Sequence, residues 1–345
     1  MKREEDESSY SSHQTSGIID SNFPESPEAW EAPDGAFKKT VVQSSNTFSK
    51  PLLEASCSIK VLSDEDNVVG LDDAASKVIV IGDVRSDVEF ILERCLLTMN
   101  VGEICDIQFK LPLKTTEPYV PRAAYLFDSS ESQEDRTQAE KETADGVSPP
   151  NDNPNKKSSD QHGKTYKVQI QLESFVAKPA IFEMKPSDKW YYACQHKDNG
   201  VSLFSAKEYK WAFRHFSLAF KYIVSLEHDN PTEDVVEEFG IHSGDFKLKC
   251  LLNLAACQLQ NGTYHHVVTN CARALEMDPD NVKALFRRGT AFNQLQEYEK
   301  AKDDLERAAV LDPKNVAVQK QIVILRDRTT KLNKYFATAM KKLFK

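Results

Sequence analysis

The sequence predicts an α+β domain, in which one helix lies against an antiparallel sheet, followed by an all-α solenoid of three repeated helix pairs with a C-terminal capping helix. Two observations carry this prediction. Short β-branched segments and one amphipathic helix occupy residues 29–178. From residue 187 onward the pattern is helical and repeats with a period of 34 residues. A chain of 345 residues is long enough for two such domains with tails.

The clearest strand of the α+β domain lies in residues 166–176. Val168, Ile170 and Leu172 alternate there with polar residues, which indicates an antiparallel strand with one buried face. Its expected neighbours are four short apolar segments: 37–43, 57–62, 77–81 and 104–111. One helix is expected within residues 85–99, because six apolar residues recur there at helical spacing: Val88, Ile91, Leu92, Cys95, Leu96 and Met99.

Two polar tracts flank or interrupt this domain. Residues 1–28 and 128–164 are rich in charged and small polar residues and poor in apolar ones. Such segments bury too little surface to offset the entropy of an ordered chain, so we expect both to be disordered. The second tract is interpreted as a long surface insertion in the α+β domain.

The helical part contains an internal repeat. Pro279 and Pro313 lie 34 residues apart, and Gly289 follows another small residue by the same interval. Small residues allow paired helices to approach closely, and a proline ends each repeat because it cannot continue a helix. A more divergent first copy carries Gly200 at the matching position. Three helix pairs are the minimum for a stable stack, so we predict a three-repeat tetratricopeptide (TPR) domain over residues 187–313.

Polar residues on the first helix of each pair suggest a ligand, because these helices line the concave groove of such a stack. In the third repeat, Lys283 and Arg287 lie four residues apart and share a helical face. Asn253 is the equivalent of Arg287 in the second repeat, and Lys197 lies three residues before Gly200 in the first. These donors suit the terminal carboxylate and acidic side chains of a peptide, since each charge-assisted hydrogen bond contributes roughly 1.5–3 kcal/mol.

The spacing of these residues resembles the two-carboxylate clamp of chaperone-binding TPR proteins, which grip the Glu-Glu-Val-Asp tail of heat-shock protein 90 or of its 70-class relative. Four of the five clamp positions match: Lys197, Asn253, Lys283 and Arg287. Val201 stands where the fifth position usually has asparagine. The resemblance implies that the four residues bind a peptide carboxylate. Val201 keeps a second interpretation open, a TPR adaptor for another acidic partner.

The order of the domains resembles that of the large FKBP immunophilins. Two segments look like parts of the family's domain: TMNVGEICDIQF (98–109) and VQIQLESF (168–175). Two others are most similar to the divergent FKBP-like members of the family: WEAPDGAFKKTVV (30–42) and the closing MKKLF (340–344). The resemblance implies an FKBP-like domain and raises the question of peptidyl-prolyl isomerase activity.

Three departures at the family's catalytic pocket predict a domain without that activity. Leu92 falls where the family has a tryptophan on its helix, and residues 63–77 lack the Phe-Asp-Ser element. The Tyr-Ala-Tyr-Gly element is also absent, although Tyr119 and Tyr125 lie nearby in the sequence. We therefore expect a non-catalytic co-chaperone whose FKBP-like domain docks an unidentified client protein, with a weakly active isomerase as the alternative.

Residues 314–345 form a basic tail, with nine Lys or Arg against one acidic residue, Asp327. The apolar residues of the tail recur at near-helical spacing, which fits a helix that covers the exposed face of the third repeat. A second interpretation is a basic amphipathic helix that binds calmodulin, as the related large immunophilins suggest.

Composition argues against several other functions. The formal net charge of −9 does not favour binding to nucleic acid. No apolar stretch reaches the ~20 residues of a membrane span, and the N-terminus has no apolar signal core, so we expect a cytoplasmic location with the nucleus as a second candidate. The seven cysteines include no C-x-x-C motif, so we expect no disulfide framework, no metal site and no cofactor.

Overall fold

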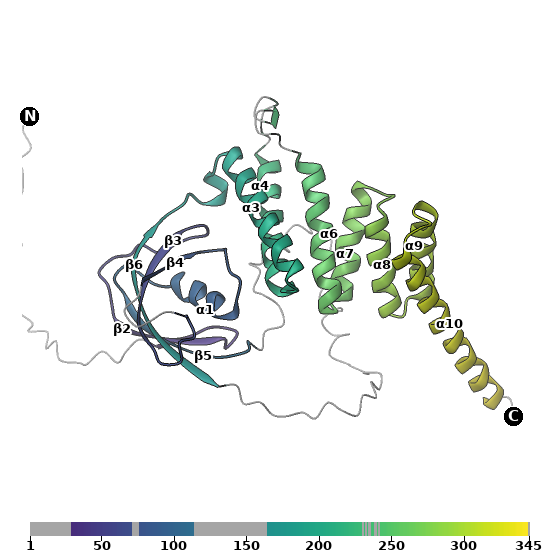
Figure 1. Ribbon diagram of the computed structural model, residues 1–345, viewed down its shortest axis with the longest axis horizontal. Coiled ribbons are helices and arrows are strands. Elements are labelled where there is room, and N and C mark those ends of the chain that lie inside the picture. The colour runs from purple at the N-terminus through teal and green to yellow at the C-terminus, as the bar shows by residue number, and fades with distance from the viewer. Residues whose placement is uncertain are drawn as a thin grey trace, which may run out of the picture.

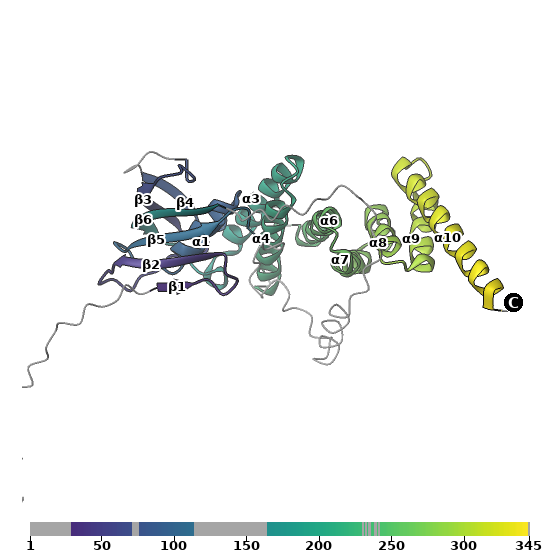
Figure 2. The same ribbon diagram turned by 90° about the horizontal axis from the view of Figure 1, so that it is seen from below.

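The computed structural model describes residues 29–70, 76–113, 164–229 and 242–343, with parts of the segment 231–240 (Figure 1). The sheet domain and the helical stack lie side by side, and the C-terminal helix extends from the far end of the stack (Figures 1 and 2). The predictions of disorder for residues 1–28 and 128–164 fall outside the described residues, except for Lys164, which is described and exposed.

The sheet has six antiparallel strands in the order β1-β2-β5-β6-β3-β4. Their bounds are Ala29–Glu31 for β1, Phe37–Gln43 for β2, Ser56–Asp64 for β3, Ser76–Val80 for β4, Ile104–Lys110 for β5 and Thr165–Val176 for β6. The long strand β6 pairs with β5 on one side and β3 on the other, and its Val168, Ile170 and Leu172 are fully buried. The alternation in the sequence is confirmed.

Helix α1, Asp87–Leu96, lies inside the curve of the sheet (Figure 1). Ser86 caps it, because its hydroxyl accepts a hydrogen bond from the Glu89 N–H at 3.2 Å. Four residues of its inner face, Ile91, Leu92, Cys95 and Leu96, are fully buried against the strands. Burial of each of the three aliphatic side chains among them contributes roughly 1.5–3 kcal/mol, so this face fastens the helix to the sheet and confirms the predicted α+β fold.

Three helix pairs follow a short 3₁₀ turn, Ile181–Glu183, in the order expected of a TPR stack (Figure 2). Their bounds are Pro186–Ser205 (α3) with Tyr209–His228 (α4), Ser243–Asn261 (α6) with Tyr264–Met277 (α7), and Val282–Gln294 (α8) with Tyr298–Leu311 (α9). A Cβ on Gly200 would lie 2.7 Å from the Phe216 ring, and one on Gly289 would lie 2.8 Å from Leu305 Cγ. The close approach predicted from small residues is therefore present in the first and third repeats.

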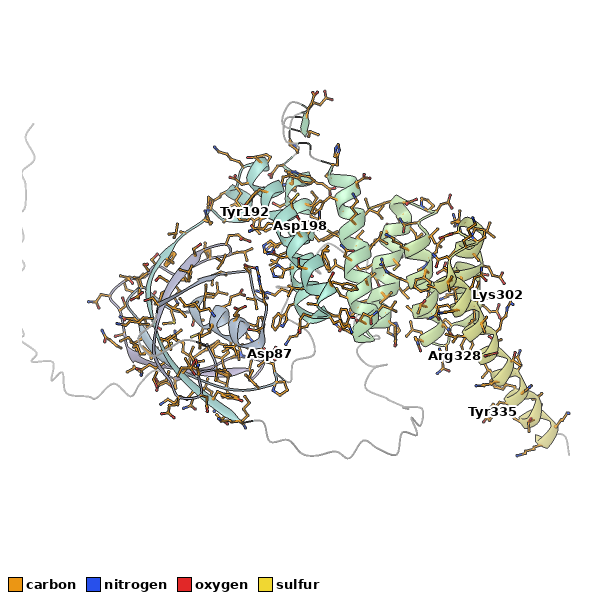
Figure 3. The ribbon with its side chains drawn as sticks, in the orientation of Figure 1. Asp87, Tyr192, Asp198, Lys302, Arg328 and Tyr335 are labelled. Carbon is orange, nitrogen blue, oxygen red and sulfur yellow. The ribbon has the colours of Figure 1, made fainter. Side chains whose placement is uncertain are left out.

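Helix α10, Val316–Leu343, covers the end of the stack with its first half. There Val318, Ile322 and Leu325 are buried against the third repeat, which confirms the capping helix. Arg328 still donates to Asn293 O at 2.9 Å, whereas Tyr335, on the part that projects beyond the stack, is 69% exposed (Figure 3). Calmodulin binding by this projecting part stays a prediction, which calcium-dependent retention on calmodulin resin would test.

Candidate functional site

The four residues predicted to bind a peptide carboxylate lie on the first helices of the three successive pairs. Lys197 belongs to α3, Asn253 to α6, and Lys283 and Arg287 to α8. Helices α6 and α8 contact each other directly. The sequence period of 34 residues thus places Asn253 and Arg287 at equivalent positions of neighbouring helices.

Arg287 links α8 to α6 at the turn that carries Asn253. Its Nη1 donates to Leu252 O at 3.0 Å, so the guanidinium lies beside the residue that precedes Asn253. Burial lowers the pKa of Arg287 from its ordinary value, but a guanidinium remains protonated in proteins. The structure therefore brings a cation and an amide together between the second and third repeats.

Lys197 reaches from α3 toward the other end of α6. Its Nζ lies 5.4 Å from the centroid of the Phe246 ring and 3.0 Å from Asp198 Oδ1. Phe246 precedes Asn253 by seven residues, which corresponds to about 10 Å along a helix. Lys197, which meets α6 at Phe246, and Asn253 therefore lie at the two ends of one stretch of α6 and do not contact each other.

Lys283 lies one turn before Arg287 and is exposed. Among the residues that the structure describes, no carboxylate forms an ion pair with Lys283, so its ammonium is available to an external anion. Val201, one turn after Lys197, is 47% exposed and offers no donor at the fifth position. The arrangement supplies three cations and one amide along three neighbouring helices, and these groups can pair with or donate hydrogen bonds to an anion.

The position that carries a tryptophan in the FKBP immunophilins is packed into the core of the sheet domain. Leu92 is fully buried in the cluster that α1 forms with the strands. The loop that precedes α1 faces the helical stack, because Val84 and Phe90 are buried together with Trp211 of α4. The phenyl and indole rings have centroids 5.7 Å apart. Tyr119 and Tyr125 lie outside the described residues.

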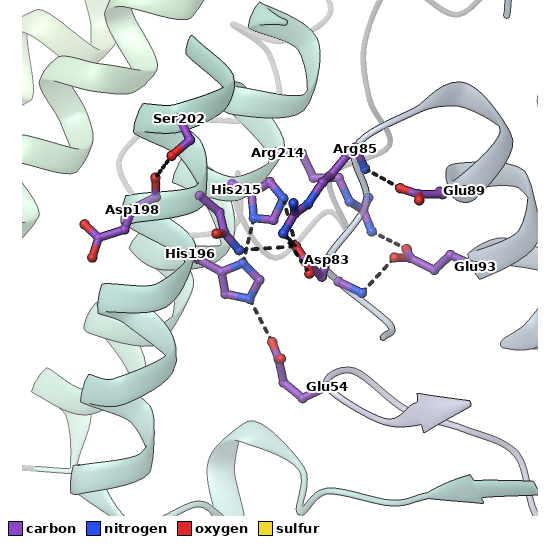
Figure 4. Close-up of polar contacts among 12 residues, drawn as sticks. Glu54, Asp83, Arg85, Glu89, Glu93, His196, Asp198, Ser202, Arg214 and His215 are labelled. Carbon is purple, nitrogen blue, oxygen red and sulfur yellow. Dashed lines mark hydrogen bonds and ion pairs between the residues drawn. The ribbon is translucent and has the colours of Figure 1, made fainter. Parts of the chain in front are cut away.

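Sequence reasoning missed a buried polar network that joins the two domains (Figure 4). It pairs carboxylates of the sheet domain with basic side chains of the first repeat, and its main members are Glu54, Asp83, Glu93, His196, Arg214 and His215. The two histidines and the arginine lie on helices where buried positions are usually apolar. Because the sequence does not mark these positions as buried, no sequence signal pointed to the network.

Other kinds of site receive no support from the described part of the chain. No group of three or more His, Cys, Asp or Glu side chains there is placed to hold a metal ion. No helix in the same residues is long and apolar enough to cross a membrane. All seven cysteines are free thiols, and six of them are buried.

The sheet with its single helix and the stack of helix pairs define an FKBP-like domain followed by a TPR domain. The tetratricopeptide repeat family matches residues 282–315, which contain α8 and α9. The human FK506-binding protein-like protein is 26% identical over 315 residues, which are 90% of this chain and 72% of that protein. Bovine peptidyl-prolyl cis-trans isomerase FKBP4 is 32% identical over 166 residues, 48% of this chain. That alignment spans 35% of FKBP4, about a third of its length.

Solved structures are more distant in sequence. A multi-domain immunophilin from Arabidopsis thaliana is 19% identical and covers 82% of this chain and 96% of its own, with a TM-score of 0.32. The C-terminal TPR-containing domain of a Plasmodium falciparum FK506-binding protein is 23% identical, with a TM-score of 0.40, and covers 45% of this chain and 99% of its own. The resemblance to FKBP-type immunophilins with TPR repeats, inferred from the sequence, is confirmed by the relatives in sequence and by the match to the repeat family.

Proposed function

We propose that this chain is a non-catalytic FKBP-like co-chaperone whose TPR groove binds the acidic C-terminal tail of heat-shock protein 90 or of its 70-class relative. One observation carries the proposal. Lys197, Asn253, Lys283 and Arg287 stand at four of the five clamp positions and lie on the first helices of three neighbouring pairs.

The span of the site suits a short extended peptide. The stretch of α6 between Phe246, which meets Lys197, and Asn253 is about 10 Å long. An extended chain advances about 3.3–3.6 Å per residue, so this stretch holds about three residues. Arg287 uses one N–H on Leu252 O and keeps its other N–H donors for a carboxylate. A peptide with a terminal carboxylate and acidic side chains within its last few residues has the matching charge.

The FKBP-like domain is proposed to dock a client protein without catalysing prolyl isomerisation. Leu92 is an aliphatic core residue at the position where active members have an aromatic pocket floor. Such a floor is part of the surface that twists the X-Pro amide against a barrier of about 18–20 kcal/mol. Weak isomerase activity is the second candidate, because a relative named as an isomerase is 32% identical to this chain over 166 residues.

Calorimetric titration of the full chain with the peptide Met-Glu-Glu-Val-Asp tests the clamp. We expect saturable binding that Arg287→Ala weakens by a factor of roughly 10 or more, because one charge-assisted hydrogen bond contributes about 1.5–3 kcal/mol. Arg307→Ala is the matched control, since it removes a half-exposed arginine of α9 that pairs with Asp280 outside the groove. Equal affinity for the two variants, or no binding by the wild type, would rule out the clamp.

A peptide amidated at its C-terminus separates the two candidate partners. The co-chaperone interpretation requires the terminal carboxylate, so amidation is expected to abolish binding. An adaptor for an internal acidic segment would bind the free and the amidated peptide equally. Val201→Asn restores the missing amide at the fifth position and is expected to tighten binding by about 0.5–1.5 kcal/mol, the net value of one hydrogen bond.

A further inference from the structure

Helix α3 takes part in two surfaces at once. Lys197 and Val201 are four residues apart and share the face that looks toward the groove. His196 and Asn199 lie on another face of the same two turns, and both bond to the FKBP-like domain. The position of the groove residue Lys197 is therefore set by a helix whose neighbouring face is held by the other domain.

The contacts on α3 are direct and short. His196 Nε2 lies 2.8 Å from Glu54 Oε1, and Tyr222 of α4 donates its hydroxyl to the same oxygen at 2.8 Å. Asn199 Nδ2 donates to Asp83 Oδ1 at 3.2 Å. Glu54 precedes β3 and Asp83 precedes α1, so two separate loops of the FKBP-like domain grip the first repeat (Figure 4).

Helix α4 extends the same contact. Arg214 forms an ion pair with Glu93 of α1, and the other oxygen of Glu93 accepts the Gly82 N–H at 2.7 Å. Lys210 Nζ lies 2.7 Å from Asp87 Oδ1 at the N-terminal end of α1. Because α4 also packs against α3, the bonds that fix α4 to the FKBP-like domain restrain α3 as well.

Three members of this contact are buried away from water. The exposed fractions of Glu93, Arg214 and His196 are 2%, 6% and 3%. Buried charges and hydrogen bonds of this kind have a single well-paired geometry, because an unpaired partner in a low-dielectric environment is costly. The first repeat is thereby restrained in one orientation relative to the FKBP-like domain.

We propose that the FKBP-like domain sets the affinity of the TPR groove by restraining α3 through the face next to its groove face, with Glu54, Asp83 and Glu93 as positioning residues for peptide binding. This inference rests on the proposed function of the groove. It assigns a role to the FKBP-like domain that needs neither catalysis nor a client. Since coupling between two sites is reciprocal, a peptide in the groove also stabilises the contact between the domains.

The test compares three variants of the full chain by peptide affinity and by hydrogen–deuterium exchange. Glu93→Gln and Asp83→Ala remove bonds between the domains and lie outside the groove. Asp83→Ala is the milder of the two, because its carboxylate is 32% exposed. Glu103→Gln is the matched control, since Glu103 is 4% exposed and pairs with Lys39 within the FKBP-like domain alone.

We expect Glu93→Gln and Asp83→Ala to speed amide exchange in α3 and to weaken Met-Glu-Glu-Val-Asp binding at least about fivefold, the lower end of typical coupling between sites. Glu103→Gln should leave peptide affinity within about twofold of the wild type, because changes at distant sites without shared partners show little coupling. In the wild type, the peptide should slow exchange in residues 82–86, which no peptide touches directly, and this response distinguishes positioning from mere stability.

The proposal is overturned if both variants speed exchange in α3 but bind the peptide with the affinity of the wild type, or if exchange in α3 does not change. If the wild type binds no peptide, the proposed function is refuted, but the proposal that the FKBP-like domain restrains α3 is not. In that case faster amide exchange in α3 of the two variants supports the restraint of α3 by the FKBP-like domain, and unchanged exchange overturns it.

Discussion

Acidification is expected to destabilise the contact between the two domains through one buried histidine. His215 of α4 is fully buried, with its Nδ1 2.9 Å from His196 Nδ1 and its Nε2 3.7 Å from Asp83 Oδ1. Burial lowers the pKa of His215 to about 3, with His196, Arg214 and Arg85 acting in the same direction and a backbone hydrogen bond with Val84 opposing them. Asp83 does not reverse this, because it lies beyond hydrogen-bond distance and already interacts with Arg85.

The sign and size of the effect follow from proton linkage. The ordinary pKa of a histidine is 6.5, so above that pH the imidazole is neutral in both the folded and the unfolded chain. Below it the unfolded chain takes up a proton that the folded chain does not, until the pH approaches about 3. Stability falls by about 1.4 kcal/mol per pH unit in this window, which gives about 2 kcal/mol between pH 6.5 and pH 5.

Urea titrations of the wild type and His215→Gln at pH 7, 6 and 5 measure this contribution. The free energy of unfolding of the wild type is expected to fall toward pH 5 more steeply than that of the variant, by about 2 kcal/mol in total. His265→Gln, which removes an exposed histidine of α7, is the control and should follow the wild type. Parallel curves for the wild type and His215→Gln would refute the reasoning.

Three further predictions concern packing and activity. Arg214→Met leaves Glu93 buried without its cation and should lower the free energy of unfolding by roughly 3–5 kcal/mol in urea titration. Adding Glu93→Leu should recover most of that loss, and simple additivity of the two changes would contradict the pairing. Gly200→Ala places a Cβ 2.7 Å from an aromatic ring of α4 and should cost about 1–3 kcal/mol, whereas Gly244→Ala meets open space and should not destabilise. The purified chain should not accelerate isomerisation of a proline tetrapeptide, because Leu92 replaces the aromatic pocket floor; catalysis above the uncatalysed rate would show the alternative to be right.

Helices and strands that are long enough to repeat their apolar spacing several times were predictable from the sequence. The apolar positions of α1 and the alternation of β6 were correct, because a helix or strand with one buried face must repeat its apolar residues at a fixed spacing. The strand β1, Ala29–Glu31, was missed because three residues are too short to display a period. The repeat interval likewise placed Asn253 and Arg287 on neighbouring helices, since equal intervals in a solenoid correspond to equal positions in space.

The contact between the domains was not predictable in this way. His196 and Glu54 are separated by 142 residues, and Arg214 and Glu93 by 121. Pairing over such intervals leaves no periodic trace, and each polar residue alone is typical of a solvated helix surface. Nor does the sequence indicate that Lys197 lies over the ring of Phe246, because side-chain contacts between repeats depend on the tilt of the helices.

The divergence of the first repeat follows from its double role. The second pair packs between two other helix pairs, and the third packs between the second pair and α10, so both contact helices of the stack alone. The pair α3–α4 must also complement two loops and a helix end of the FKBP-like domain, and it carries His196, Arg214 and His215 at buried positions for that purpose. A fragment that begins at α3 would expose these side chains together with Trp211. The TPR domain, cut at its boundary in the sequence, therefore loses contacts that stabilise its first repeat. For this reason the affinity of the groove should be measured on the full chain.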